Sequence, residues 1–180
     1  MDAKGRARCE SVVQNAGMKE GHTVLDFGCG TGNYTIPVAK RVGPGGTVYA
    51  IDSDAPKLKE LTERARREHL DGIIQVWHTN GELTVALSSA SIDAVLLYDI
   101  FWYFPPGNRL CVLLKEVRRL LRGDGFLSVF PEHIDVLALQ REIESTGFHL
   151  QRHITTEVLH DGKLQAGELF TFEKAPLPAQ

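Results

Sequence analysis

Cysteine is scarce in this sequence, and so are long apolar runs and any excess of basic residues. The three cysteines among 180 residues are an odd number without metal-ligand spacing. They argue against a disulfide framework and predict no metal site and a reducing, cytoplasmic location. No stretch approaches the roughly 18 apolar residues of a membrane span, and the N-terminus lacks the apolar core of a signal peptide. We therefore expect no membrane partner.

Charge and composition are those of an ordinary globular protein. The formal net charge is −3, with 20 Lys and Arg against 23 Asp and Glu, so there is no basic field to attract DNA. Apolar residues make up 43% of the chain and charged residues 24%, which is typical of globular proteins. Residues 1–180 contain no repeat or linker and are predicted to form a single domain. Composition leaves the oligomeric state open between monomer and homodimer.

Three glycines at alternate positions stand between an apolar run and a helical pattern. Residues 24–27 predict a buried strand, and residues 34–42 predict a helix. Gly28, Gly30 and Gly32 predict the tight loop that joins them. At such a junction a ligand can lie directly on the backbone, facing the N–H groups of the helix start. An ordinary tight turn would explain one of these glycines but not all three.

Two classes of nucleotide cofactor bind at junctions of this kind. Dinucleotide enzymes use G-x-G-x-x-G, whose third glycine would fall at Asn33, so an NAD-dependent oxidoreductase is the less favoured alternative. Asp26 precedes Gly28 by two residues, which completes a D-x-G-x-G-x-G pattern. This pattern resembles motif I of the class I S-adenosylmethionine-dependent methyltransferases. The resemblance covers nearly the whole chain, and its specific part is residues 24–35 together with Asp52.

The resemblance implies an α/β fold. It is a three-layer Rossmann-like sandwich with a seven-stranded, mostly parallel sheet and an antiparallel C-terminal hairpin strand. The pattern of the chain agrees with it. Further strands are expected at 47–51, 73–78, 91–98, 126–130, 150–159 and 164–174, and helices at 4–16, 107–121 and 134–146. Asp161-Gly162 predicts the hairpin turn, and residues 123–125 predict another turn. The nearby arginines, Arg118, Arg119 and Arg122, are expected to form a solvated face.

Two carboxylates accompany the glycine loop. Asp52 ends the second strand, 20 residues after Gly32, where it is placed to accept hydrogen bonds from both ribose hydroxyls of a cofactor. Each charge-assisted hydrogen bond contributes on the order of 1.5–3 kcal/mol. A helix cap or a solvated loop acid is the alternative for Asp52. Asp26 is expected to order the loop by accepting its N–H groups.

Other residues are assigned to S-adenosylmethionine by the resemblance. Asn80 follows the third strand, where an amide can pair with the adenine edge. Thr79 is nearly as well placed, and ordinary turn chemistry explains Asn80-Gly81 equally well. Ser53 is expected near the adenine ring, and Asp99 near the methionine amino group.

Candidates on the methyl-acceptor side follow the fourth and fifth strands. They are Tyr98, Tyr103, Glu132 and His133. His133 has the unperturbed pKa of a general base, near 6.5, but it could equally cap the next helix. Phe101 and Phe104 are expected to pack in the core.

Methyl transfer is an in-line displacement at a cationic sulfur. Positioning can supply much of its rate, roughly 7–11 kcal/mol in favourable intramolecular systems, and a base is needed only if the nucleophile arrives protonated. We therefore expect a methyltransferase that acts on a small molecule. The sequence indicates its cofactor-binding residues but does not identify the acceptor. A non-catalytic S-adenosylmethionine-binding protein on the same fold is the alternative.

Overall fold

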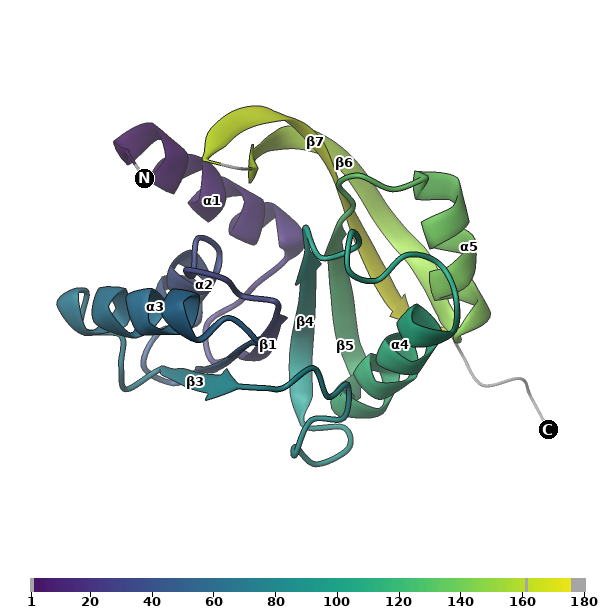
Figure 1. Cartoon of the computed structure of the whole chain (residues 1–180), viewed down its shortest axis with the longest axis horizontal. Coiled ribbons are helices and arrows are strands. Elements are labelled where there is room, and N and C mark those ends of the chain that lie inside the picture. Colours follow the sequence, from purple (N-terminus) through teal and green to yellow (C-terminus); the bar gives the residue numbers. More distant parts are fainter. Residues whose placement is uncertain (1, 161, 176–180) are drawn as a thin grey trace.

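The computed structural model describes residues 2–160 and 162–175 (Figure 1). Its helices are α1 (Ala3–Ala16), α2 (Thr35–Val42), α3 (Ala55–Arg67), α4 (Asn108–Leu120) and α5 (Val136–Ser145). Its strands are β1 (Thr23–Phe27), β2 (Thr47–Asp52), β3 (Ile74–His78), β4 (Ile92–Tyr98), β5 (Leu121–Phe130), β6 (Phe148–His160) and β7 (Lys163–Lys174). Asp161 of the expected hairpin turn lies outside the described residues.

The seven strands form one sheet in the order β3-β2-β1-β4-β5-β7-β6. The pairs among the first five strands are parallel, whereas β7 runs antiparallel to both of its neighbours, β5 and β6. This confirms the predicted sheet. The chain runs outward from β1 to β3 and then crosses to β4 on the other side of β1. A topological switch point therefore lies between β1 and β4, and ligands of open α/β sheets bind at such points.

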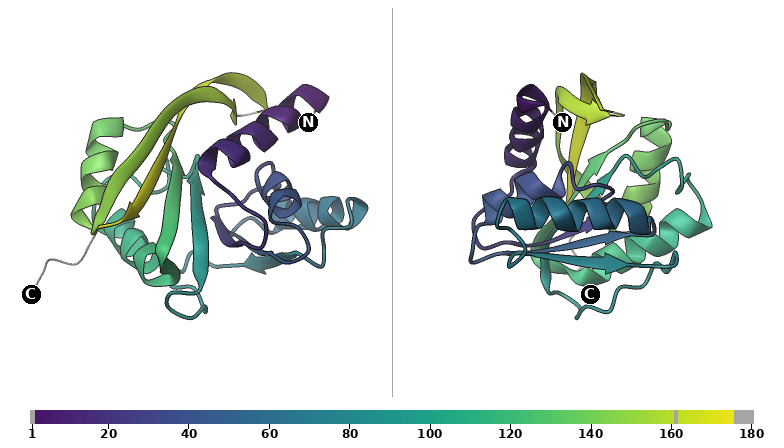
Figure 2. Two further views of the ribbon diagram at one scale, coloured as in Figure 1. Left: turned by 180° about the vertical axis from the view of Figure 1, so that it is seen from behind. Right: turned by 60° about the vertical axis from the view of Figure 1, so that its left-hand side comes forward.

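Helices cover both faces of the sheet and give three layers (Figure 2). Helices α1, α2 and α3 share one buried apolar cluster with the sheet, and α4 and α5 share the other. Strand β4 serves both, because successive side chains point to opposite faces: Leu96 belongs to the first cluster and Leu97 to the second. No helix within the described residues is both long and apolar enough to cross a bilayer.

The β6–β7 hairpin arches over the molecule toward α1 (Figures 1 and 2). Arg8 of α1 forms an ion pair with Glu157 of β6, with 2.6 Å between Nη2 and Oε2. The Tyr34 hydroxyl accepts the backbone N–H of Leu159 at 3.1 Å and donates to the Leu159 carbonyl at 3.3 Å. These contacts hold the tip of the hairpin close to the start of α2 and hence to the glycine loop.

The turn predicted at residues 123–125 is a bulge within β5. Ile92 of β4 pairs with Leu121, but Ala94 pairs with Phe126, so residues 122–125 of β5 stand opposite Asp93 alone. The Asp93 carboxylate ties this irregularity to the sheet, since it accepts the Thr23 N–H at 2.7 Å and pairs with Arg122 at 2.6 Å. Gly125 relieves crowding inside the strand, because a Cβ atom there would lie 3.0 Å from the carbonyl oxygens of Ile92 and Asp93, whereas a Cβ atom at Gly123 would meet nothing within 4 Å.

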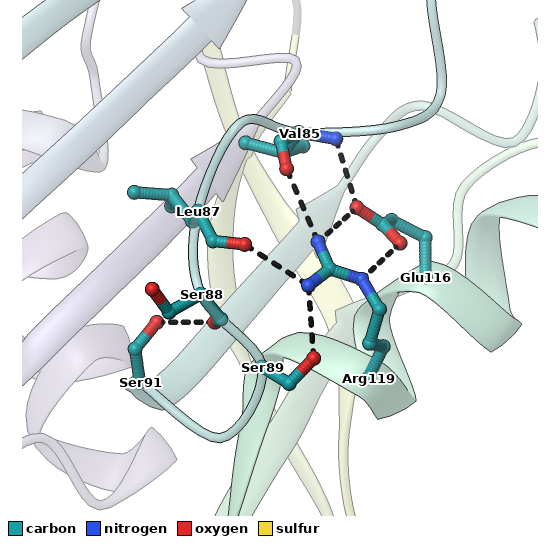
Figure 3. Close-up of polar contacts among 7 residues, drawn as sticks. All are labelled: Val85, Leu87, Ser88, Ser89, Ser91, Glu116 and Arg119. Atoms are coloured by element: carbon teal, nitrogen blue, oxygen red, sulfur yellow. Dashed lines mark hydrogen bonds and ion pairs between the residues drawn. The ribbon is translucent and has the colours of Figure 1, made fainter.

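Arg122 is exposed, as expected. Arg119, which was expected on the same solvated face, is instead only partly exposed. Its guanidinium donates to both carboxylate oxygens of Glu116 at 2.7 Å, and to the carbonyls of Val85 and Leu87 (Figure 3). Glu116 also accepts the Val85 N–H at 2.8 Å. The pair fastens the irregular β3–β4 connection to α4. Arg118 likewise donates to a backbone carbonyl, that of Gly147, at 3.2 Å.

Candidate functional site

A cavity of about 530 Å³ opens at the switch point, at the carboxyl ends of β1, β2 and β4. We call it the switch-point cavity. Its wall includes the glycine loop, the segments that follow β2, β3 and β4, and the tip of the β6–β7 hairpin. Of the predicted cofactor residues, the cavity is lined by Asp26, Gly28, Gly30, Asp52, Ser53 and Asp99. The fold thus brings together residues that the sequence separates by more than 70 positions.

The glycines of the loop serve different purposes. All three have positive φ, at 83° for Gly28, 53° for Gly30 and 81° for Gly32. A Cβ atom at Gly28 would lie 2.4 Å from Cγ2 of Ile100, and one at Gly32 would lie 2.3 Å from Cδ1 of Leu61. A Cβ at Gly30 would meet no protein atom within 4 Å. Gly28 and Gly32 therefore allow close packing, whereas Gly30 leaves bare backbone at the cavity.

Asp52 joins the end of β2 to the glycine loop. Its Oδ2 accepts the N–H of Gly30 at 2.7 Å, and its Oδ1 accepts the N–H of Asp54 at 2.9 Å. A carboxylate offers about four acceptor positions, so each oxygen keeps one for a ligand hydroxyl. This arrangement fits the predicted role at a ribose, and contact with the cofactor stays a prediction. Asp54 caps α3 by accepting the Lys57 N–H at 3.1 Å.

Asp26 lies beneath the loop and is only 3% exposed. Its Oδ2 accepts the hydroxyl proton of Thr35, the first residue of α2, at 2.6 Å. The expected ordering role is therefore exerted through a threonine hydroxyl, not through the loop N–H groups that we predicted. Burial raises the pKa of the Asp26 carboxyl to about 6, and the nearby Asp52 carboxylate acts in the same direction.

The segment after β3 places Thr79, not Asn80, on the cavity wall. Thr79 lines the cavity together with Gly81 and Glu82, whereas Asn80 is not among its lining residues. The backbone N–H of Asn80 donates to the Glu82 carboxylate at 2.7 Å. Of the two alternatives that the sequence left open, geometry favours Thr79, and the pairing of Asn80 with adenine stays an untested prediction.

The acceptor-side tyrosines differ in their surroundings. Tyr98 is buried, its hydroxyl lies 2.8 Å from Ser128 Oγ, and its ring packs edge-on against Tyr34. Burial also raises the pKa of the Tyr98 hydroxyl, which makes it a poor proton acceptor or donor near neutral pH. Both tyrosines line the cavity, but Tyr103 is 69% exposed. Tyr103 is therefore the better candidate for contact with an acceptor.

Phe101 and Phe104 pack in the core, as predicted. Phe104 packs edge-on against Phe27, and the Arg109 guanidinium lies 4.9 Å from the centre of the Phe104 ring. Arg109 also lines the cavity, and nothing in the sequence singled it out. The carboxylate of Glu132, a further acceptor-side candidate, accepts the side-chain amide of Gln165 at 3.0 Å.

His160 is a residue that sequence reasoning missed. Its Nδ1 lies 2.7 Å from Oδ2 of Asp99, which is 61 positions away in sequence. Its Nε2 lies 3.0 Å from Nε2 of His133. In the sequence His160 is the end of a strand beside a hairpin turn, and no local signal could have linked it to the other two residues.

The switch-point cavity, the glycine loop and Asp52 together have the geometry expected of a nucleotide-type cofactor site on a doubly wound α/β sheet. A model of the family described as "Methyltransferase domain" matches residues 25–129. A structure of a SAM-dependent methyltransferase from Aquifex aeolicus superposes with a TM-score of 0.73 at 22% identity. The match covers 91% of this chain and 88% of that one, and it shows the same fold.

Two curated relatives have similar sequences. A demethylmenaquinone methyltransferase of Lactobacillus johnsonii is 30% identical over 62% of this chain and 44% of its own length. A 2-phytyl-1,4-naphtoquinone methyltransferase of Trichormus variabilis is 37% identical over 69% of this chain and 52% of its own length. The chain thus spans about half the length of these relatives or less. It belongs to the class I S-adenosylmethionine-dependent methyltransferase family.

Proposed function

We propose that this protein transfers the methyl group of S-adenosylmethionine to a nucleophile on a small-molecule acceptor. The observation that carries the proposal is the pairing of Asp52 with Gly30 at the switch point of a methyltransferase-family sheet. The names of the two relatives, which specify quinone-type acceptors, support a small molecule. When bound, the cofactor supplies a sulfonium carbon that is open to in-line attack.

Each of four cavity residues would make a specific contact with the cofactor or the acceptor. Asp52 would accept hydrogen bonds from the two ribose hydroxyls, and Gly30 would let the cofactor rest on the backbone. The Asp99 carboxylate would face the positively charged methionine amino group. Such fixed contacts favour reaction by holding the donor in one orientation. Tyr103, exposed at the cavity, would contact the acceptor.

The first test is calorimetric titration of the full chain with S-adenosylmethionine, S-adenosylhomocysteine and NAD. We expect the first two to bind and NAD not to bind. Tight NAD binding without any response to S-adenosylmethionine would overturn the proposal.

The second test follows release of S-adenosylhomocysteine over a panel of quinols, phenols and amines. Turnover of one acceptor class is expected. A cofactor that binds but is never consumed across the panel would favour a non-catalytic binding protein.

A further inference from the structure

Three side chains from distant parts of the chain converge beside the switch-point cavity. Asp99 follows β4, His133 follows β5, and His160 ends β6. Within residues 2–160 and 162–175, they form the one group of three His, Cys, Asp or Glu residues whose donor atoms lie close enough to hold a metal ion, all within 4.8 Å of one another. The sequence predicted no metal site, because these residues share no local motif.

We propose that His133 and His160 bind a divalent transition-metal ion and that Asp99 orients His160. Imidazole nitrogens lie about 2.1 Å from a bound ion such as Zn²⁺. At about 2.1 Å from the ion, two such nitrogens stand about 3.0 Å apart in octahedral coordination and about 3.4 Å apart in tetrahedral coordination. The Nε2 atoms of His133 and His160 are 3.0 Å apart. In the metal-free protein a proton bridges this gap, and the ion would take its place after a small rotation of the exposed His133 ring.

Asp99 is assigned the outer position. Two donors on opposite sides of one ion span about 4.2 Å, and the three donor atoms here spread over as much as 4.8 Å. The 2.7 Å contact from Asp99 Oδ2 to His160 Nδ1 instead matches a carboxylate–histidine–metal arrangement. In that arrangement the carboxylate accepts a hydrogen bond from the Nδ1–H group of His160. Nε2 of His160 is then unprotonated and directed at the ion.

The backbone supports a built site. Asp99 has φ of 55° and His133 has φ of 59°, which is the left-handed region that residues other than glycine seldom occupy. Such conformations cluster at active sites and ligand-binding sites, and among the described residues His69 and Ala90 also adopt them. Asp99 directly follows β4, and His133 lies three residues beyond the end of β5, so both are at the edge of the sheet that carries the cavity.

Two protein ligands leave coordination positions open for water or another ligand. Asp99 lines the switch-point cavity, and His133 is exposed, so an ion held here would face solvent beside the cavity wall. On the basis of the proposed function, we assign these open positions to a hydroxyl or carboxylate oxygen of the acceptor. A metal ion polarises such an oxygen and lowers the pKa of a bound hydroxyl.

The test is calorimetric titration of the untagged full chain with Ni²⁺ alone. We expect one ion per chain with micromolar affinity. His133→Asn and His160→Asn should abolish this binding, and Asp99→Ala should weaken it about 10- to 100-fold, as is usual for residues that orient a ligand. His149→Asn is the matched control, because His149 is an exposed histidine of β6 far from the group.

Wild-type affinity in His133→Asn, or the absence of saturable nickel binding by the native chain, would overturn the proposal. His133 is exposed, so its substitution should leave thermal unfolding unchanged, and this variant decides the matter even if His160→Asn fails to fold. Cofactor titration separates the two proposals. Nickel binding without S-adenosylmethionine binding would remove only the methyltransferase assignment, and the reverse result would remove only the metal site.

Discussion

The carboxylate of Asp52, at the end of β2, accepts the backbone N–H of Gly30 in the loop that follows β1, with 2.7 Å between Oδ2 and the nitrogen. The acid at the end of one strand thus fixes the loop at the end of its neighbour. Any ligand that lies on Gly30 also lies beside this carboxylate, so loop geometry and ligand affinity depend on the same side chain.

Replacement of Asp52 by alanine should therefore weaken S-adenosylmethionine binding. Loss of two charge-assisted hydrogen bonds predicts a deficit of about 2 kcal/mol or more, roughly a 30-fold rise in Kd. Isothermal calorimetry measures it, with Asp71→Ala, at an exposed acid of the α3–β3 turn, as the control. Equal affinity of the Asp52→Ala variant and the native protein would remove Asp52 from the site.

Gly28→Ala should destabilise the protein. The left-handed backbone costs an L-residue about 1–2 kcal/mol, and the new methyl would meet Ile100, so the free energy of unfolding should fall by about 2–4 kcal/mol. Urea denaturation measures this change. Gly72→Ala, in open space and without positive φ, should stay within about 0.5 kcal/mol of the native value. A native-like midpoint for Gly28→Ala would contradict the packing argument.

Gly30→Ala should separate binding from folding. Its Cβ would meet no protein atom within 4 Å, so the loss of stability should be smaller than for Gly28→Ala and limited to the backbone cost, about 1–2 kcal/mol. Cofactor affinity should nevertheless fall, because the methyl occupies the surface on which the ligand rests. Calorimetry and urea denaturation of the same two variants give both values. Unchanged cofactor affinity would mean that the ligand does not approach the loop at this point.

Arg119→Ala should loosen the β3–β4 connection. The substitution removes the bonds to Val85 and Leu87 and leaves the Glu116 carboxylate, with its side chain 10% exposed, without its ion-pair partner. Because Arg119 itself is partly exposed, we expect a loss of about 1–2 kcal/mol of unfolding free energy. Faster hydrogen exchange confined to residues 79–91 would accompany it. Lys115→Ala, at an exposed position of the same helix, should change neither measurement.

Asp26 should make stability fall as the pH rises from about 4 to 7. Burial raises the pKa of its carboxyl from 3.8 to about 6 in the folded protein, so the unfolded chain releases the proton first. Below the pKa of Asp26 in the unfolded chain, its burial lowers the free energy of unfolding by nothing. Above its pKa in the folded protein the loss is complete, about 2–3 kcal/mol at ~1.36 kcal/mol per pKa unit. Asp26→Asn should therefore gain stability relative to the native protein across this window. A constant difference between the two proteins in urea denaturation at each pH would refute the assignment.

The sheet was predictable because its signals are local. Apolar runs such as residues 92–98 mark strands that are buried on both faces, and the alternate glycines with Asp26 mark one specific junction. The order of these elements leaves few topologies open once parallel connections are right-handed and short. Asp52 was predictable for the same reason, since it stands at the end of an identifiable strand.

The remainder of the site depends on contacts between segments that are distant in sequence. His160 meets Asp99 across 61 positions, and Arg119 meets Val85 across 34. Neither partner alters the local pattern of the other, so Arg119 was assigned to a solvated face and His160 was given no role. The bulge at 122–125 escaped prediction in a similar way, because a glycine such as Gly125 gives the same sequence signal whether it forms a turn or relieves crowding inside a strand.

The position of β7 also constrains how the polypeptide reaches its native state. Among the described residues this strand comes last in sequence, yet it occupies an interior place between β5 and β6. During synthesis the edge of β5 therefore lacks its native neighbour, and can form non-native strand pairs, until β7 has been synthesised as far as residue 174. Late insertion of β7 would then complete both the sheet and the wall of the switch-point cavity. Chains that end before β7 would therefore lack a complete cavity.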